Sequence, residues 1–384
     1  MFMRLKSVLR LIGGVSIAAC LLAATPLLEG AIVADGDVNL TPYGVYYIGY
    51  LGDGNLTVNS GLLESLEAYI AYNSGVTGEA TVTGDGSTWT NSSSLYIGLY
   101  GNGKLNVEEG GCVNNNAVCY LGCEASSTGE VTVTGVGSTW TNNYEPYIGY
   151  FGSGTMNIEA GGQVSTWGGY LGYEAGSMGE ATVSGAGSTW TNSGNLDIGE
   201  NGNGTLHIEN GGQVNNRSGY LGGGASSTGE VTVTGTGSTW TNSSSLSVGR
   251  GGRGILHIED GGLVSVATLL SINDCNGEDS FIEMSNGGML ALTGDVDDSL
   301  DDFLYRIVGT DDIRYWDDSL DGWTPITNAT RGVDYTLVYL DNAGSDLYGY
   351  TLLTVGAVPE PSVFVLLVAG GMGLLGYRGM RRMR

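Results

Sequence analysis

The sequence predicts an all-β protein folded as a right-handed parallel β-helix, and three observations lead to this prediction. Glycine accounts for 68 of the 384 residues, whereas proline accounts for only six. The hexapeptide Gly86-Ser-Thr-Trp-Thr-Asn91 recurs, which places tryptophans 50 or 51 residues apart at Trp89, Trp140, Trp190 and Trp240. Self-similarity at that period is typical of solenoids. Between the glycines, short segments alternate apolar and polar residues, as half-buried strands do.

Each 50-residue unit contains two coils. The segments that begin at Tyr147, Tyr170 and Leu196 mark successive coil starts about 25 residues apart. Within a coil, residues 130–134 and 205–209 alternate so that their Val, Leu and Ile side chains share one face. Glycines between the strands supply the positive φ that tight bends need. We therefore expect strands of successive coils to stack at roughly 4.8 Å.

The N-terminal 34 residues are typical of a secretory signal peptide. Cationic side chains at Arg4, Lys6 and Arg10 precede an apolar stretch over 11–28, and Ala34 is a small residue before a cleavage point at Asp35. We expect signal peptidase to remove residues 1–34, which form a signal helix. Residues 17–20, Ile-Ala-Ala-Cys, leave a lipoprotein cut as an alternative. Either route takes the protein out of the cytoplasm.

The solenoid is predicted over 35–294, with a short β module over 295–357 that caps it. Coils at 46–61 and 264–294 are degenerate, as terminal coils of a repeat array are expected to be. In the module, residues 334–339 and 350–355 alternate like strands. The module is too short to supply a translocating barrel, which needs at least eight strands of ~10 residues.

The tail over 358–384 has three parts in a fixed order. A rigid break, Pro359-Glu360-Pro361, comes first, and an apolar run over 362–377 follows. The chain then ends on four arginines: Arg378, Arg381, Arg382 and Arg384. The prolines separate the run from the preceding domain. The run is shorter than the ~20 residues of a full transmembrane helix, so we expect a transient apolar anchor helix. Arginines after it would hold its end in the cytoplasm.

These parts of the tail resemble the PEP-CTERM sorting signal of Gram-negative bacteria. The resemblance implies export, recognition by a membrane exosortase, cleavage nearby and delivery to the envelope, the outer surface or an extracellular biofilm matrix. An ordinary C-terminal anchor helix is the alternative.

The repeats over 46–294 resemble the autotransporter-type passenger repeat, which implies a β-helix displayed at the cell surface.

The charge of the predicted mature chain limits its partners. Residues 35–357 hold 38 of the 40 acidic side chains but only seven of the 14 basic ones, a formal charge of −31. Such a surface repels nucleic acid and anionic lipid. It can instead collect divalent cations, and an acidic cluster suggests calcium at Asp295, Asp297, Asp298, Asp301 and Asp302. A solvated acidic face is the alternative, because the cluster lacks the glycine and glutamate of an EF-hand loop.

The tryptophans and threonines each allow two interpretations. The column Trp89, Trp140, Trp190 and Trp240 is either a glycan-stacking stripe or core filler, because Trp140 shares a face with Ser138 and Asn142. Pairs such as Thr132 with Thr134 and Thr139 with Thr141 are either an ice- or mineral-binding array or ordinary β residues.

Histidines and cysteines give weak signals. His207 and His257 occupy equivalent repeat positions two coils, or ~10 Å, apart, which is too far for one zinc ion, and we expect them to be solvated. Cys112, Cys119 and Cys123 permit one local disulfide in an oxidising compartment. Cys275 lies about six coils away from that cluster and is expected to be free or to pair between chains.

We expect no enzymatic activity. Glycosidases need two carboxylates at a set separation, whereas Glu130, Glu180 and Glu230 recur with the coil, as structural residues do. The sequence therefore predicts a structural or adhesive surface protein that binds extracellular polysaccharide or cell-surface glycan, with no cofactor other than calcium. A polysaccharide lyase or glycoside hydrolase on a β-helix, and an ice- or mineral-binding protein, are the alternatives.

Overall fold

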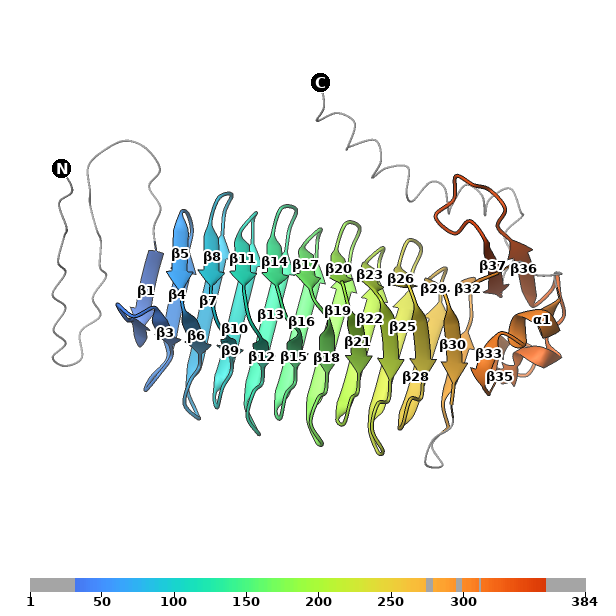
Figure 1. Cartoon of the computed structure of the whole chain (residues 1–384), viewed down its shortest axis with the longest axis horizontal. Coiled ribbons are helices and arrows are strands. Elements are labelled where there is room, and N and C mark those ends of the chain that lie inside the picture. The colour runs from blue at the N-terminus through green and yellow to red at the C-terminus, as the bar shows by residue number, and fades with distance from the viewer. Residues whose placement is uncertain (1–31, 274–278, 295–298, 311, 357–384) are drawn as a thin grey trace, which may run out of the picture.

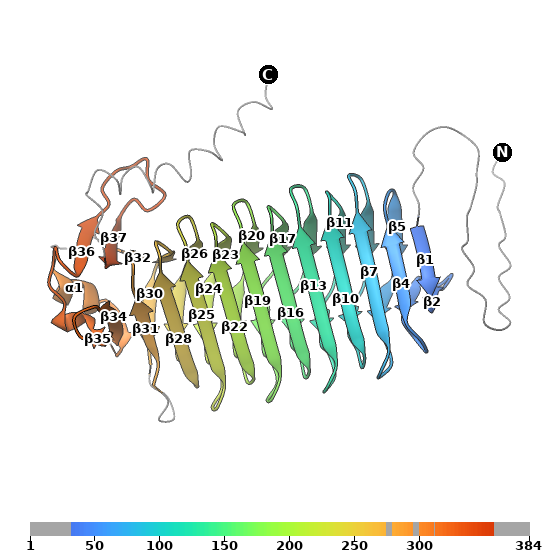
Figure 2. The ribbon, with the colours of Figure 1, turned by 180° about the vertical axis from the view of Figure 1, so that it is seen from behind.

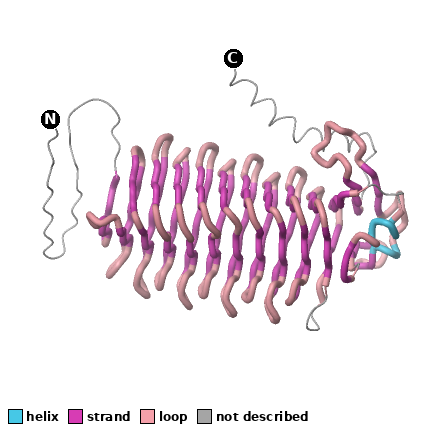
Figure 3. Tube along the Cα trace, in the orientation of Figure 1, coloured by secondary structure: helices cyan, strands magenta, loops and turns pink. Residues whose placement is uncertain are grey.

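The chain forms a long rod of stacked coils in a computed structural model (Figure 1). The structure describes residues 32–273, 279–294, 299–310 and 312–356. Three sheets run along the rod, and each central coil contributes one strand to each sheet. Loops join the strands at the corners of every coil (Figure 3). The predicted all-β parallel solenoid is confirmed, while its right-handed winding stays a prediction.

The first sheet carries the longest strands and is called the long-strand sheet (Figure 2). Its strands, in order, are β1 (Ile32–Gly36), β4 (Gly54–Val58), β7 (Thr77–Thr83), β10 (Asn102–Glu108), β13 (Thr128–Thr134), β16 (Ser153–Glu159), β19 (Met178–Ser184), β22 (Asn203–Glu209), β25 (Thr228–Thr234), β28 (Arg253–Glu259), β31 (Phe281–Met284), β34 (Ile313–Asp317) and β35 (Gly322–Pro325).

The second sheet holds the repeat tryptophans and is called the tryptophan sheet. Its strands, in order, are β5 (Leu62–Ser65), β8 (Thr88–Asn91), β11 (Cys112–Asn115), β14 (Thr139–Asn142), β17 (Gln163–Thr166), β20 (Thr189–Asn192), β23 (Gln213–Asn216), β26 (Thr239–Asn242), β29 (Leu263–Val266), β32 (Gly288–Thr293), β37 (Tyr350–Val355) and β36 (Tyr335–Tyr339).

The third sheet carries a row of tyrosines and is called the tyrosine sheet. Its strands, in order, are β2 (Val38–Leu40), β3 (Val45–Ile48), β6 (Glu67–Ile70), β9 (Leu95–Ile97), β12 (Cys119–Leu121), β15 (Pro146–Ile148), β18 (Gly169–Leu171), β21 (Asn195–Ile198), β24 (Ser218–Leu221), β27 (Ser245–Val248), β30 (Leu269–Ile272) and β33 (Ile307–Gly309).

Successive coils are in register. Leu105 of β10 pairs with Ala80 of β7 on one side and with Val131 of β13 on the other. Burial alternates along each strand, so that one face of every sheet points inward. The predicted coil of about 25 residues and the inward face of its strands are therefore both confirmed.

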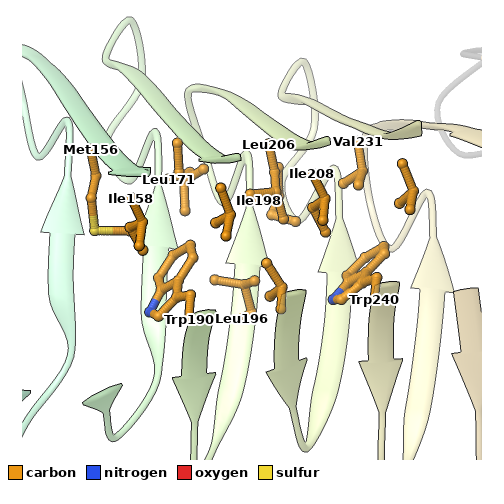
Figure 4. Close-up of a cluster of buried hydrophobic side chains, with 14 of the residues drawn as sticks. Met156, Ile158, Leu171, Trp190, Leu196, Ile198, Leu206, Ile208, Val231 and Trp240 are labelled. Atoms are coloured by element: carbon orange, nitrogen blue, oxygen red, sulfur yellow. The ribbon is translucent and has the colours of Figure 1, made fainter. Parts of the chain in front are cut away.

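The inward side chains form one continuous core along the rod. Ile158 and Ile208 enter it from the long-strand sheet, Leu171 and Leu196 from the tyrosine sheet, and Trp190 from the tryptophan sheet (Figure 4). All five are fully buried. Burying an aliphatic side chain of this size contributes roughly 1.5–3 kcal/mol relative to leaving it exposed. The solenoid is thus stabilised coil by coil.

Glycine at the coil corner follows from how closely the backbones of neighbouring coils approach. Gly149 has a φ of +74°, and a Cβ atom there would lie 2.1 Å from the carbonyl oxygen of Met178 in the next coil. No side chain fits at that distance, and L-residues rarely adopt that φ.

Antiparallel strands lie at both ends of the rod. β1 and β2 pair antiparallel with β4 and β3, while β37 pairs antiparallel with β32 and β36. In the segment predicted as a separate cap (295–357), β33 and β34 first continue the parallel stack on β30 and β31. The helix α1 (Leu300–Leu304) and the 3₁₀ turn η1 (Ile326–Asn328) accompany them. The end strands cover backbone edges that would otherwise be open.

The two targeting segments fall largely outside the described residues. Of the predicted signal peptide, only Ile32–Ala34 are described, and they begin β1. The predicted apolar tail helix and its sorting residues lie wholly outside: Pro359, Glu360, Pro361, Arg378, Arg381, Arg382 and Arg384. Within the described ranges, no helix has the length and apolar character needed to span a membrane.

Candidate interaction surface

The four repeat tryptophans lie inside the rod. Each has 0% of its surface exposed, and together they are the largest of the fully buried side chains: Trp89, Trp140, Trp190 and Trp240. They occupy every second coil of the tryptophan sheet, and valines such as Val164 and Val214 occupy the coils between them. A sugar ring cannot reach these indoles. The interpretation of these tryptophans as a glycan-stacking stripe is therefore wrong, and they are core residues.

A column of buried side-chain amides runs beside the indoles. Asn91 Nδ2 donates to Asn115 Oδ1 at 2.8 Å, and Asn115 Nδ2 donates to Asn142 Oδ1 at 2.5 Å. Further along, Trp240 Nε1 donates to Asn216 Oδ1 at 2.6 Å. Buried polar groups need such partners, because leaving one unsatisfied costs about 1–3 kcal/mol. This column was not predicted from the sequence, although the asparagine that ends each hexapeptide was its signal.

The outward face of the tyrosine sheet presents a regular row of aromatic rings, called the tyrosine ladder. Its members are the half-buried side chains of Tyr47, Tyr69, Tyr96, Tyr120, Tyr147 and Tyr170. Neighbouring ring centroids are 4.8–5.3 Å apart, and neighbouring planes lie within 13° of each other. Because paired strands are ~4.8 Å apart, the register of the backbone alone sets this spacing.

A second set of rings flanks the ladder, and the two together are called the aromatic surface. The flanking rings are Tyr50, Tyr72, Tyr100, Tyr150, Phe151 and Tyr173. Tyr150, for example, lies edge-on to Tyr147 at 5.3 Å and stacks on Tyr173 at 5.4 Å. Tyr100, Phe151 and Tyr50 are 47%, 43% and 38% exposed. Such aromatic contacts each add about 0.5–1.5 kcal/mol beyond burial.

The ladder phenols carry no charge near neutral pH. Burial, reinforced by neighbouring phenols and thiols, raises the pKa of Tyr120 to about 12. Burial together with Asp197 and other carboxylates likewise raises the pKa of Tyr170 to about 12. The ladder is therefore a row of uncharged, amphipathic phenols on an acidic rod. The ladder was not predicted, because Tyr147 and Tyr170 served only as markers of coil starts. Their outward place in an alternating strand was the available signal.

The ladder is interrupted at β21. Asp197 there pairs in register with Tyr170 of β18 and with Tyr220 of β24. Asp197 is only 6% exposed, and its Oδ1 lies 3.3 Å from Arg250 Nη1. Burial and the nearby Glu200 raise the pKa of Asp197 to about 7, against the lowering effect of Arg250. This charged cluster breaks the repeat and was not predicted.

Arg250 reaches the cluster from two coils away. Its Nη1 lies 3.8 Å from Glu200 Oε2, and its guanidinium sits 4.7 Å from the centre of the Tyr220 ring. Gly223 lies next to Glu200, and a Cβ atom on Gly223 would be 2.3 Å from Glu200 Oε2. The absence of a side chain at Gly223 thus leaves the space in which this contact forms.

The acidic residues of the long-strand sheet do follow the coil. Glu130, Glu180 and Glu230 share one outward column in which Thr155 and Thr205 lie between them. Asp197 and Glu200 depart from this regularity, so they do not share the repeat positions that mark Glu130, Glu180 and Glu230 as structural. Asp197 is, however, covered and held by Arg250.

The two histidines share one column of the long-strand sheet, with Thr232 between them, which confirms their separation by two coils. The expectation that both are solvated was wrong for His257. Its Nδ1 lies 3.1 Å from Glu283 Oε2, and its Nε2 lies 3.5 Å from Glu230 Oε1. The hydrogen bond to Glu283 raises the pKa of His257.

The described cysteines are free thiols, so the local disulfide that the sequence permits is not formed. Cys112 lies on the tryptophan sheet, whereas Cys119 lies fully buried on the tyrosine sheet. Burial raises the pKa of Cys123 to about 12. Cys275 lies outside the described residues.

The calcium prediction is only partly covered by the structure. Asp301 and Asp302 lie in the first turn of α1, where Ser299 caps the helix by accepting from the Asp302 backbone N–H. Asp295, Asp297 and Asp298 lie outside the described residues. Across the described ranges, no three Asp, Glu, His or Cys side chains come together as metal ligands. Calcium binding stays a prediction.

Other residues lie between the threonines of each outward column. Thr132 lies in register between Asn106 and Asn157, and Thr139 lies beside Gln163. From β7 onward, threonine recurs in these columns only on alternate coils. Such a surface is not the continuous threonine array that the ice-binding alternative requires.

Comparison with known proteins gives limited matches. No protein-family model matches the chain. An uncharacterized lipoprotein, YdeK of Escherichia coli strain K12, is 33% identical over 127 residues, which are 32% of this chain. The matched part of the chain spans only 10% of that relative's length. A crystal structure of a TibC-catalysed hyper-glycosylated TibA fragment covers 66% of this chain and 89% of its own, at 20% identity and a TM-score of 0.21.

Proposed function

We propose that the protein is an exported, non-enzymatic β-solenoid that serves as a structural and adhesive component of the cell surface or extracellular matrix. The aromatic surface is its binding face. The observation that carries this proposal is the row of six stacked tyrosines, in register on one side of the rod. Tyrosine offers a large amphipathic contact area at low entropic cost, and these rings are already held in place by their neighbours.

The ligand class that fits this face is an uncharged extracellular polysaccharide or cell-surface glycan. Sugar rings present C–H groups to aromatic rings and hydroxyl groups to phenols. A polyanion would be repelled by a rod whose residues 35–357 carry a formal charge of −31. An extended neutral chain can touch several rungs at once, and many weak contacts then add up to firm attachment.

Export and sorting form part of the same proposal. Signal peptidase and an exosortase would process the two ends, and the tail would hold the protein in a Gram-negative membrane at least transiently. The local likeness to a protein named as a lipoprotein supports a place in the envelope. The winding of the rod is right-handed in this proposal, because parallel crossover connections are right-handed in about 98% of cases.

The test is retention of the full chain on an insoluble neutral glycan, with microcrystalline cellulose and chitin as probes. A triple variant, Tyr50→Ser, Tyr100→Ser and Phe151→Ser, removes the most exposed rings of the aromatic surface and should lower retention. The matched control, Tyr305→Ser with Tyr348→Ser, removes rings that are 91% and 57% exposed in the C-terminal segment, away from the aromatic surface, and should leave retention unchanged. Equal retention of both variants contradicts the proposal.

The same samples distinguish the alternatives. Release of reducing ends or unsaturated sugars from soluble envelope polysaccharide would identify an enzyme, and Asp197 and Glu200 would be the first residues to substitute. Thermal hysteresis would identify ice binding. Retention without either signal supports the adhesive rod.

A further inference from the structure

We propose that the tyrosine ladder is a site of oxidative coupling, at which neighbouring phenols become joined by ring carbon–carbon bonds when hydrogen peroxide and a haem peroxidase act on the exported rod. This modification would tie successive coils together covalently. It does not depend on glycan binding, since it concerns bonds between side chains of the same molecule.

The geometry brings the reacting rings together. Tyr120 is stacked on Tyr96 at 5.2 Å and on Tyr147 at 5.3 Å, with interplanar angles of 11° and 13°. Because the rings are nearly parallel and occupy equivalent positions of paired strands, matching carbons lie at about the same separation as the centroids. The phenol neighbours of each ring are thus fixed in advance, and among them the ladder partners are the nearly parallel ones, which gives the coupling the advantage of an intramolecular reaction.

The chemistry balances with peroxide as the oxidant. Each of two neighbouring phenols gives up one electron and one proton, which leaves two phenoxyl radicals. The radicals join through the carbons next to the hydroxyls, and each of those carbons then passes its hydrogen to the phenolic oxygen, which restores both rings. The pair has lost two hydrogen atoms overall, and one hydrogen peroxide takes them up to become two waters.

Among the described residues, exposed tyrosines away from the aromatic surface lack such a partner. Tyr43, Tyr305 and Tyr348 are 85%, 91% and 57% exposed, and none of them takes part in a ring contact among the described residues. Radicals formed on them can meet only a second molecule. In dilute protein the linked products should therefore come from the ladder rather than from the most exposed rings.

The charged cluster predicts where the links stop. Asp197 separates Tyr170 from Tyr220, and a carboxylate has no ring carbon with which to couple. Links should accordingly join neighbours from Tyr47 to Tyr170, and Tyr220 should remain unlinked. This boundary distinguishes coupling along the ladder from random oxidation of accessible tyrosines.

The experiment treats dilute full-length protein with peroxide and a haem peroxidase, then maps linked peptides by mass spectrometry alongside dityrosine fluorescence. We expect within-chain links between ladder neighbours, each with the loss of two hydrogens. In Tyr120→Phe, which keeps the stacked ring but lacks the phenol, links to Tyr96 and Tyr147 should disappear while the Tyr147–Tyr170 link persists. Tyr348→Phe is the control and should change neither.

Two outcomes overturn the proposal. One is the absence of within-chain links at the ladder while exposed tyrosines couple between molecules. The other is an unchanged map in Tyr120→Phe. Circular dichroism of the variant establishes that the sheet persists. Since Tyr120→Phe keeps an aromatic ring in the aromatic surface, glycan retention is read separately and can fail without affecting this result.

Discussion

Trp240 donates its indole N–H to the side-chain oxygen of Asn216, one coil earlier, at 2.6 Å. Both side chains are buried, so the bond satisfies a donor and an acceptor that water cannot reach. Trp89 and Trp190 make equivalent bonds to Ser65 and Thr166. The indole N–H of Trp140, in contrast, has no hydrogen-bond partner in the described structure. The same repeat position therefore carries a hydrogen-bonded indole in three coils and an indole without a partner in the fourth.

Phenylalanine at these positions should separate the hydrogen bond from the packing. Trp240→Phe leaves the buried Asn216 oxygen without its donor, whereas Trp140→Phe removes a donor that has no partner. We expect Trp240→Phe to destabilise the rod by about 1–3 kcal/mol more than Trp140→Phe. Urea denaturation, with hydrogen exchange of the flanking strands as a local readout, measures the difference. Equal losses in the two variants would show that the bond contributes nothing net.

Alanine at two corner glycines should show the cost of close backbone approach. Gly149 and Gly176 both have positive φ, but a Cβ atom would lie 2.1 Å from the Met178 carbonyl at Gly149, while nothing lies within 4 Å at Gly176. Gly176→Ala should cost about 1 kcal/mol, the strain of the dihedral angle. Gly149→Ala should cost about 3 kcal/mol, because the stacked backbones must also move apart. Thermal unfolding of both variants tests this ranking, and a larger loss for Gly176→Ala would contradict it.

Asp197 should make the stability of the rod depend on pH. Its folded pKa of about 7 exceeds its ordinary value of 3.8, so the unfolded chain loses this proton at a lower pH than the folded chain does. The stability that comes from protonated Asp197 is therefore fully present below about pH 4 and is lost as pH rises through 7. Asp197→Asn mimics the protonated form. Its stability advantage over the parent should therefore grow between pH 4 and 8, to at most about 4 kcal/mol. A constant difference in melting temperature across that range would count against the raised pKa.

His257 should give a pH dependence of its own. The hydrogen bond to Glu283 raises its pKa, so the stabilisation is fully present below about pH 6.5 and is lost as pH rises through the raised value. His257→Gln should remove this decline. His207→Gln is the matched control, because His207 lies two coils away in the same column between Thr182 and Thr232. Parallel melting curves from pH 5 to 9 compare the variants, and a decline that persists in His257→Gln refutes the assignment.

Thiol labelling should rank the cysteines by burial. Cys119 is fully buried, and the pKa of Cys123 is raised to about 12, so neither should react with iodoacetamide at pH 8 in the folded protein. The partly exposed Cys112 should react first. In urea all three should label without a reductant, as peptide mass mapping would show. Labelling of Cys119 and Cys123 that requires reduction would instead reveal a disulfide.

Much of the fold follows from local sequence. A period of two residues defines the inward face of each strand, and the repeat of about 25 residues defines the coil, so the register of His207 with His257 was predictable. Alternation also placed Ser138, Trp140 and Asn142 on one face. It did not establish whether that face was core or surface, because a strand has two faces and large aromatic rings occur on both.

The sequence by itself determined the coil, its strand faces, its acidic charge and the order of its segments, because each of these depends on neighbours along the chain. Only the tertiary structure decided which residues meet across coils. Tyr147 stacks on Tyr170 although 23 residues separate them, and Arg250 contacts Asp197 across 53 residues. Such contacts depend on how closely coils stack and on gaps such as Gly223, and both are set by backbone pairing in three dimensions rather than by any local pattern.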